Sequence, residues 1–430
     1  MVNFMLTLIS GAFPFCLTVL VGGYFTLKTG FFQLKYFSKS FIALKGEKGR
    51  GISSFSAMCN SLSAALGTGN IVGVAAALST GGAGAVFWMW VSAFFSMVIK
   101  SAEIALGVFY RSKKGGNFTG GPHIYINNAM PKKLRFISFI FAFIGFFATF
   151  FCGNMTQINS AVSGVSNRLD IRFLIGVLSA IAVLVIIYGG AQKIADFLTK
   201  LLPFMAVAYI LLCLGVIFKN YNQIPLAIKS IFIGAFSPKA VTGGAIGSIL
   251  KVVSVGASKG IFSNEAGVGT AAIAHSQVLC AKPFLQSLYG IFEVFIDTIL
   301  LCTLTALTIL TSGVIIDYNK APASHLTISA LSTLYGNASG YILSGLLLLF
   351  GISSVIGWAT YGISFSEFLY GNFGKKVFIL SYPLFCVVGA VLSANFIWQT
   401  AEFLNGVLVI INLLVLMFLS KNVITILKEK

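Results

Sequence analysis

Charged side chains are scarce in this chain. Of its 430 residues only 9% are Asp, Glu, Lys or Arg, whereas 57% are hydrophobic. Soluble domains are about 25% charged and about 45–50% apolar. So few charges do not cover the surface of a soluble protein. The composition therefore excludes a soluble domain and predicts an integral membrane protein.

Acidic residues are fewer still, with 11 Asp and Glu against 29 Lys and Arg and a formal net charge of +18. Such an excess can indicate a nucleic-acid partner. With the N-terminus outside, however, 22 of the 29 basic residues fall in cytoplasmic segments, six fall outside, and Lys251 falls within a span. This distribution follows the positive-inside rule. The charge therefore predicts a cell-membrane protein with a cytoplasmic C-terminus and no nucleic-acid partner.

Motifs for metal binding and catalysis are also lacking. The seven cysteines are scattered without a CxxC pair, and the three histidines are far apart. We interpret the cysteines as small packing residues. No Ser/His or paired-Asp motif stands out. The sequence therefore predicts neither an enzyme nor a bound cofactor.

Long apolar runs are abundant, and a membrane span needs roughly 20 apolar residues. Eleven segments qualify: 4–27, 52–78, 83–109, 136–165, 172–189, 197–218, 242–258, 284–312, 339–369, 377–393 and 397–419. The connections between them are mostly short. The sequence thus predicts one all-α polytopic membrane domain over residues 1–430, whose first segment is a retained span rather than a cleaved signal peptide.

The second segment, 52–78, carries its own interruption. Gly67-Thr68-Gly69-Asn70 places two glycines at mid-depth, where they weaken a helix. Unwound backbone at that depth is tolerated only where it is buried in protein or lines a wet cavity. Its free carbonyls can hold a cation, and the following helix N-terminus can hold an anion. The interruption therefore favours a site for a zwitterion and a cation, with a packing kink as the alternative.

Two other spans carry polar faces. Asn154 and Gln157 are three residues apart, so they share one helix face, which forms either a ligand wall or an interhelical hydrogen bond. Ser354 and Trp358 share a face of the 339–369 span. A binding pocket and ordinary core packing are the two interpretations of that face.

The 242–258 segment begins with several glycines and contains Lys251. If the ten spans after the first form two inverted halves of five, this segment corresponds to 52–78. Interrupted segments at matching positions of two halves indicate a transporter binding site. Gly247 is therefore a candidate binding residue.

Two acids, Glu293 and Asp297, lie one turn apart in the 284–312 span. Acids inside a membrane are costly and indicate function by default. The pair can hold a cation or a proton. The alternative is a structural pair that involves Lys251.

Several longer motifs occur along the chain: GTGNIVGVA (67–75), GGAGAVFWMWVSAFF (81–95), GGPHIYI (120–126), GNMTQINS (153–160), GIFSNEAGVGTA (260–271), FIDT (295–298) and SSVIGWATYG (353–362). Together they resemble the motifs of the alanine or glycine:cation symporter family, in that family's order. The resemblance covers nearly the whole chain.

This resemblance implies a leucine-transporter-type 5+5 inverted repeat with an extra N-terminal helix. The extra helix is 4–27, the first repeat is about 52–218, and the second repeat is about 242–419. It implies sodium-coupled import of a small neutral amino acid, alanine or glycine, by a protein that acts as a monomer. A glutamine-preferring or proton-coupled member and an uncoupled exchanger are alternatives within transport, and an ion channel is the alternative from another class.

The expected substrate residues are those at the interruption and on the polar faces: Thr68, Gly69, Asn70, Asn154, Gln157, Gly247 and Trp358. The resemblance also implies a sodium ion between the interrupted helix and the 339–369 span, at Ala64, Ala65, Gly67, Ser353 and Ser354. Glu293 and Asp297 form the rival cation site. We expect the FSNEAGVG stretch, 262–269, to be a mobile cytoplasmic segment outside the pocket.

Overall fold

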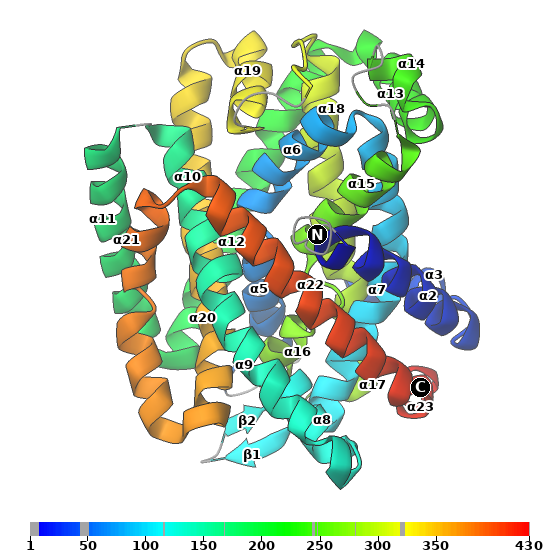
Figure 1. The fold of residues 1–430 in the computed structure, drawn as a ribbon, viewed down its shortest axis with the longest axis vertical. Coiled ribbons are helices and arrows are strands. Elements are labelled where there is room, and N and C mark those ends of the chain that lie inside the picture. The colour runs from blue at the N-terminus through cyan, green and yellow to red at the C-terminus, as the bar shows by residue number, and fades with distance from the viewer. Residues whose placement is uncertain are drawn as a thin grey trace.

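The computed structural model describes residues 8–43, 51–114, 117–166, 168–242, 246, 248–279, 281–318 and 323–429. The described residues are almost entirely helical, as the sequence predicts. A single two-stranded antiparallel hairpin, β1 (Ser112–Lys114) and β2 (Asn117–Thr119), lies at one end of the molecule (Figure 1). The opposite end carries α13 (Ile224–Phe236), α14 (Pro238–Thr242) and α19 (Ala323–Tyr335).

The first part of the chain comprises η1 (Leu8–Ala12), α2 (Phe13–Lys28), α3 (Phe32–Lys35), α4 (Phe37–Ile42), α5 (Ser54–Ala65), η3 (Thr68–Asn70), α6 (Val72–Gly81), α7 (Gly84–Phe109), α8 (Pro122–Ala129), η4 (Lys132–Leu134), α9 (Phe136–Phe150), η5 (Phe151–Met155), α10 (Thr156–Val165), α11 (Leu169–Ile187), α12 (Gly190–Lys219) and η6 (Tyr221–Gln223). The rest comprises α15 (Ile249–Asn264), α16 (Thr270–Ser276), α17 (Pro283–Val294), η7 (Phe295–Cys302), α18 (Thr303–Thr311), α20 (Ala338–Ser381), α21 (Leu384–Val391), α22 (Ala394–Phe418) and α23 (Ser420–Lys428).

Seven described helical segments are long and apolar enough to cross a membrane, or eight if the bent pair α5 and η3–α6 counts as one span. A multi-pass membrane protein is therefore confirmed. The figure of eleven spans stays a prediction, because several segments do not form single long helices. α2 and α15 have 16 residues each. α20 contains the predicted span 339–369 and runs past a break at Gly371, where φ is 64°, into the start of the predicted span 377–393.

The predicted interruption near Gly67 is present. The chain bends by 55° between α5 and the η3–α6 segment. Gly67 is extended there (φ −111°, ψ −152°), and a Cβ atom on it would lie 2.3 Å from Gln157 Oε1. A side chain at this position does not fit, so the glycine lets α10 approach the unwound backbone.

A second interruption separates α15 from α16. Glu265 has a left-handed backbone (φ 55°), and Gly267 and Gly269 also have positive φ, at 90° and 82°. The sequence placed the corresponding irregular segment earlier, at the glycines of 242–247. These glycines, Gly243, Gly244 and Gly247, lie outside the described residues.

The prediction that residues 262–269 lie outside the pocket is wrong. The stretch is buried, apart from half-buried Phe262. Phe262 and Glu265 line the cavity described below. The glycines that suggested a mobile loop instead allow the backbone to turn inside the helix bundle.

Long helices surround these two interrupted ones. α7 packs against α15, α16 and α17, and α20 packs against α5, α9 and α10. Small residues allow the close approach: a Cβ atom on Gly256 of α15 would lie 2.2 Å from the Ala85 carbonyl oxygen of α7. The outer faces of α9, α11 and α12 expose large apolar side chains such as Phe139, Leu178 and Leu211. That surface suits a bilayer.

Candidate substrate and cation site

A small cavity lies at the break in α5. Its volume is about 10 Å³, which is room for about one water molecule. The lining residues come from both interrupted helices and from η5, α10, α20 and α22: Ala64, Ala65, Gly69, Cys152, Gln157, Phe262, Glu265, Trp358 and Asn405. An amino acid enters this space only if the surrounding helices move apart.

Gln157 holds the unwound backbone from α10. Its side-chain oxygen Oε1 accepts hydrogen bonds from the Thr68 amide at 2.9 Å and from the Thr68 hydroxyl at 3.0 Å. Its amide nitrogen donates to the Cys152 carbonyl at 3.3 Å. The glutamine thus satisfies a donor that the broken helix leaves free, at the place where a ligand carboxylate is expected.

Trp358 forms the opposite wall and is fixed at both ends. Its ring packs directly on Gly153, where an added Cβ atom would lie 2.3 Å from Trp358 Cγ. Its indole Nε1 donates a hydrogen bond of 2.7 Å to Glu265 Oε1. Trp358, Gln157 and Gly69, three of the predicted substrate residues, therefore meet at one cavity.

The structure places two other predicted residues away from it. The Asn154 amide donates to the Tyr382 carbonyl at 2.8 Å, so it ties η5 to the end of α20. The Asn70 amide points to Asp297 Oδ1 at 2.7 Å and to the Ser263 hydroxyl at 3.0 Å. Neither asparagine lines the described cavity.

Four lining residues were missed by sequence reasoning: Cys152, Phe262, Glu265 and Asn405. Glu265 is an acid within an apolar stretch, and the general cost of such acids was a signal that could have identified it. Cysteine and phenylalanine are ordinary in membrane spans, so nothing in the sequence pattern distinguished Cys152 or Phe262 as lining residues.

The predicted cation ligands separate in the structure. The Ser354 hydroxyl donates to the Ala64 carbonyl at 2.7 Å, at the C-terminal end of α5. A Cβ atom on Gly67 would lie 3.1 Å from the same hydroxyl. Ser353 instead donates to Phe350 of its own helix at 2.9 Å. Ser354 thus meets the free end of α5, and Ser353 does not.

Glu293 and Asp297 belong to two different clusters. Glu293 is fully buried; it forms an ion pair with Lys100 at 3.0 Å and a hydrogen bond with His275 at 2.6 Å. Its partner is therefore not Lys251, the candidate suggested by the sequence, whose side chain is exposed. Asp297 accepts hydrogen bonds from Asn70, from Ser263 at 2.9 Å and from Thr298 at 2.7 Å.

Oxygen atoms are therefore gathered near both candidate cation positions, as hard cations require. Among the described residues, no group of three or more His, Cys, Asp or Glu side chains is arranged to hold a metal ion. A cation at the first position would rely on backbone carbonyl and hydroxyl oxygens. A cation at the second position would rely on the Asp297 carboxylate with hydroxyl and amide oxygens.

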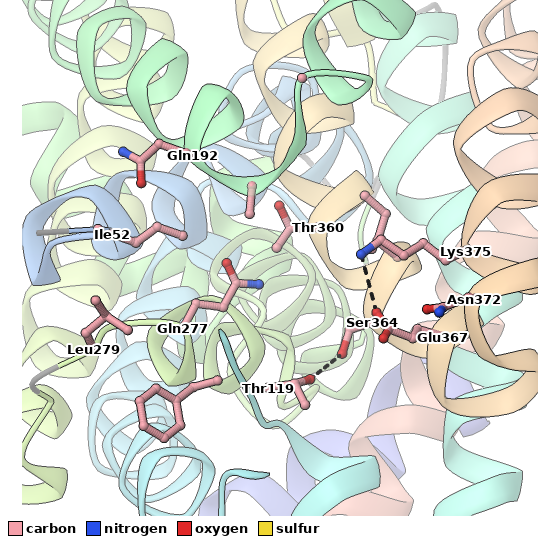
Figure 2. Close-up of a pocket in the computed structure, with 15 residues that line it drawn as sticks. Ile52, Thr119, Gln192, Gln277, Leu279, Thr360, Ser364, Glu367, Asn372 and Lys375 are labelled. Atoms are coloured by element: carbon pink, nitrogen blue, oxygen red, sulfur yellow. Dashed lines mark hydrogen bonds and ion pairs between the residues drawn. The ribbon is translucent and has the colours of Figure 1, made fainter. Parts of the chain in front are cut away.

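A larger cavity of about 630 Å³ lies near the β1–β2 hairpin, between the start of α5, the turn before α12 and the α20 helix. In Figure 2 the Thr360 side chain lies among the lining residues, with the Glu367–Lys375 pair to one side. That pair is 3.6 Å apart, and Thr360 accepts a hydrogen bond of 3.1 Å from Asn60 of α5. We call this cavity the vestibule. It lies beside the start of α5 and beside α20, and both of these helices also contribute residues to the small cavity.

Comparison with known proteins agrees with this architecture. The model of the sodium:alanine symporter family matches residues 1–429. The sodium/alanine symporter AgcS of Methanococcus maripaludis is 36% identical over 428 residues, which cover 96% of this chain and 93% of that protein.

Two further relatives are similar over comparable lengths. An uncharacterized transporter of Haemophilus influenzae is 36% identical, covering 94% of this chain and 90% of its own. A Bacillus subtilis protein named "probable sodium/glutamine symporter GlnT" is 35% identical, covering 95% and 85%. These relatives are transporters rather than enzymes. With a family match along almost its whole length, the chain belongs to the sodium:alanine symporter family.

Proposed function

We propose that this protein is a sodium-coupled symporter that imports a small neutral amino acid, alanine or glycine, by alternating access. The observation that carries the proposal is the small cavity at the α5 break, where a backbone amide end, an amide side chain and a carboxylate converge. Its tight walls, Trp358 and Phe262, favour a small side chain. The names of the relatives support an amino-acid substrate and a sodium ion.

The proposed architecture is the 5+5 inverted repeat, with α2 as part of the extra helix. Two interrupted helices support it: α5–α6 opens the first half and α15–α16 opens the second. In transporters, interrupted helices at matching positions of two halves often border the binding site, which supports a site at the interface of the proposed repeats. Alternating access then requires that cation and substrate bind the outward and inward states with different affinity.

We place the coupling sodium first at the Ala64 and Gly67 carbonyls with the Ser354 hydroxyl. The Ser354–Ala64 hydrogen bond supports this assignment, because it brings the two oxygens together. If the hydroxyl proton rotates away, both oxygens can coordinate a sodium ion through their lone pairs. The Asp297 cluster is the second candidate, and a proton is the alternative ion there.

The proposed location is the cell membrane, with the N-terminus outside and the vestibule open to the cytoplasm. The basic hairpin region supports this orientation, since Arg111, Lys113 and Lys114 lie at the vestibule end. The vestibule is then the exit route for the amino acid, and a site built within one chain supports monomeric action.

Uptake by the purified full chain in proteoliposomes tests the proposal. An inward sodium gradient should drive accumulation of radiolabelled alanine above equilibrium, whereas potassium in place of sodium should not. Competition by glycine and glutamine then ranks the substrates. Sodium-independent uptake that requires internal amino acid would identify an exchanger instead, and ion current without amino acid would identify a channel.

A further inference from the structure

Glu265 is the one carboxylate among the residues that line the small cavity. Its side chain is buried, with 4% of the residue exposed. Oε1 accepts from the Trp358 indole at 2.7 Å, and Oε2 accepts from the Thr270 hydroxyl at 2.9 Å. An ionised carboxylate has about four acceptor positions. Two neutral donors therefore leave it able to bind a further donor from the cavity.

The fixed cation nearby is already engaged. Lys100 of α7 forms an ion pair with Glu293 at 3.0 Å and donates to the Asn264 carbonyl at 2.8 Å. Within the part of the chain that the structure describes, no ion pair includes Glu265. A buried carboxylate without a paired charge is costly. A cationic group that arrives in the cavity would offset that cost.

The backbone at Glu265 supports a role for its side chain. Only Glu265 and Phe31 among the described non-glycine residues have positive φ. Glycine or asparagine is the usual residue where a helix ends in this conformation. A glutamate in the left-handed region is strained, and such strain gathers at ligand sites. The requirements of the helix end therefore do not account for this residue.

We infer that Glu265 binds the ammonium group of the substrate, an inference that rests on the proposed function. The two charges of an α-amino acid then find complementary partners in one small cavity. The carboxylate group faces the backbone amides near Gly69, and the ammonium group faces Glu265. Trp358 orients the carboxylate of Glu265 through the indole hydrogen bond.

Ligand-induced thermal stabilisation of the purified full chain tests this assignment. Wild type should be stabilised by sodium, and further by alanine at saturating sodium, but weakly by propionate, which is alanine without its amino group. Glu265→Gln should need at least tenfold more alanine, as the loss of a charge-assisted hydrogen bond implies. Its preference for alanine over propionate should collapse, and its response to sodium alone should be unchanged.

Glu402→Gln is the matched control, because this carboxylate pairs with Lys259 and does not line the cavity. It should respond to alanine as wild type does. Glu265→Asp keeps the charge on a shorter side chain and should need at least threefold more alanine for the same thermal stabilisation. If Glu265→Gln does not fold, the result for Glu265→Asp tests the inference.

Smaller losses, or a retained preference for alanine over propionate, would overturn the inference. So would a weakened sodium response with unchanged alanine affinity at saturating sodium, since Glu265 would then be a cation ligand. If wild type itself responds to no amino acid, the proposed function fails first.

Discussion

Gly67 and Gln157 show how one missing side chain permits the site. The glutamine oxygen lies where a Cβ atom on Gly67 would be, and it holds the Thr68 amide and hydroxyl. The backbone break, the amide side chain and the close approach of α10 therefore depend on one another. A change at any of them should alter binding before it alters the fold.

Gly67→Ala should weaken alanine binding about tenfold, because the new methyl group displaces Gln157 and its hydrogen bonds, worth about 1–2 kcal/mol together. The measurement is competition against radiolabelled alanine in proteoliposomes. Gly73→Ala on the neighbouring α6 is the control, since its Cβ atom would meet nothing within 4 Å. Equal affinities for the two variants would place Gly67 outside the site.

Trp358→Ala should broaden selectivity and weaken alanine binding. The indole closes the cavity and packs on Gly153, so its removal leaves room for larger neutral side chains. Stability should fall by about 3–5 kcal/mol, as for other buried aromatic truncations. A counterflow panel from glycine to leucine provides the measurement. Trp90→Ala serves as control, because Trp90 bonds Thr303 away from the cavity. If Trp358→Ala shows the same substrate selectivity as wild type, Trp358 does not limit the size of the binding cavity.

At the scale of elements, two interrupted helices meet, and the long helices α20 and α7 hold them in place. α20 contributes Trp358 and Ser354 on one face, one to the cavity and one to the carbonyl end of α5. α7 contributes Lys100, which ties the end of α15 to α17 through Asn264 and Glu293. The proposed substrate and cation residues and the buried ion pair thus lie on the same few helices.

Ser354→Ala should raise the sodium concentration for half-maximal alanine uptake about tenfold, since a lost partner of a charged group costs roughly 1.5–3 kcal/mol. Ser353→Ala should leave it unchanged, because its hydroxyl bonds within α20. Sodium titrations of initial uptake rates compare the two. If Asp297→Asn abolishes sodium dependence while Ser354→Ala retains it, the ion belongs with Asn70 and Ser263 instead.

Lys100→Met should lower the free energy of unfolding by about 3–5 kcal/mol, because it leaves Glu293 as a buried charge with one partner fewer. Lys259→Met should cost less, since its pair with Glu402 is partly exposed. Thermal unfolding of both variants in detergent measures the difference. Similar losses in the two variants would mean that the buried Lys100–Glu293 pair stabilises the fold no more than the partly exposed Lys259–Glu402 pair does.

At the scale of the whole molecule, the two cavities differ in size and position. The vestibule of about 630 Å³ lies near the β1–β2 hairpin, whereas the small cavity is buried among helices. A hydrogen bond from Asn60 of α5 to Thr360 of α20 joins these two helices. A passage through the membrane therefore requires movement of the helices that this contact connects.

Cysteine labelling tests the proposed orientation. In a background without native cysteines, Gln192→Cys in the vestibule should react with an impermeant thiol reagent in inside-out vesicles only. Asn337→Cys, exposed before α20, should react in right-side-out vesicles only. The reverse pattern would invert the topology. Val268→Cys should react slowly from either side, because Val268 is fully buried.

The sequence alone determined the membrane class, the interruption at Gly67 and the family, because hydropathy, charge bias and local glycine pattern are properties of short segments. It also identified Gln157 and Trp358 as polar or aromatic residues out of place in a span. Only the tertiary structure decided which way the asparagines point. The side-chain nitrogens of Asn70 and Asn154 donate to Asp297 and Tyr382, partners more than two hundred residues away.

The same limit explains Glu265. Its local pattern, an acid beside glycines, fits a solvated loop as well as a buried helix break. The choice depends on α7, α20 and α22 closing around it, and on a Trp358 donor 93 residues away in the chain. The cost of an acid in an apolar stretch could have singled out Glu265 as a residue, but contacts between distant segments have no local signature. Its position in the cavity therefore followed only from the folded chain.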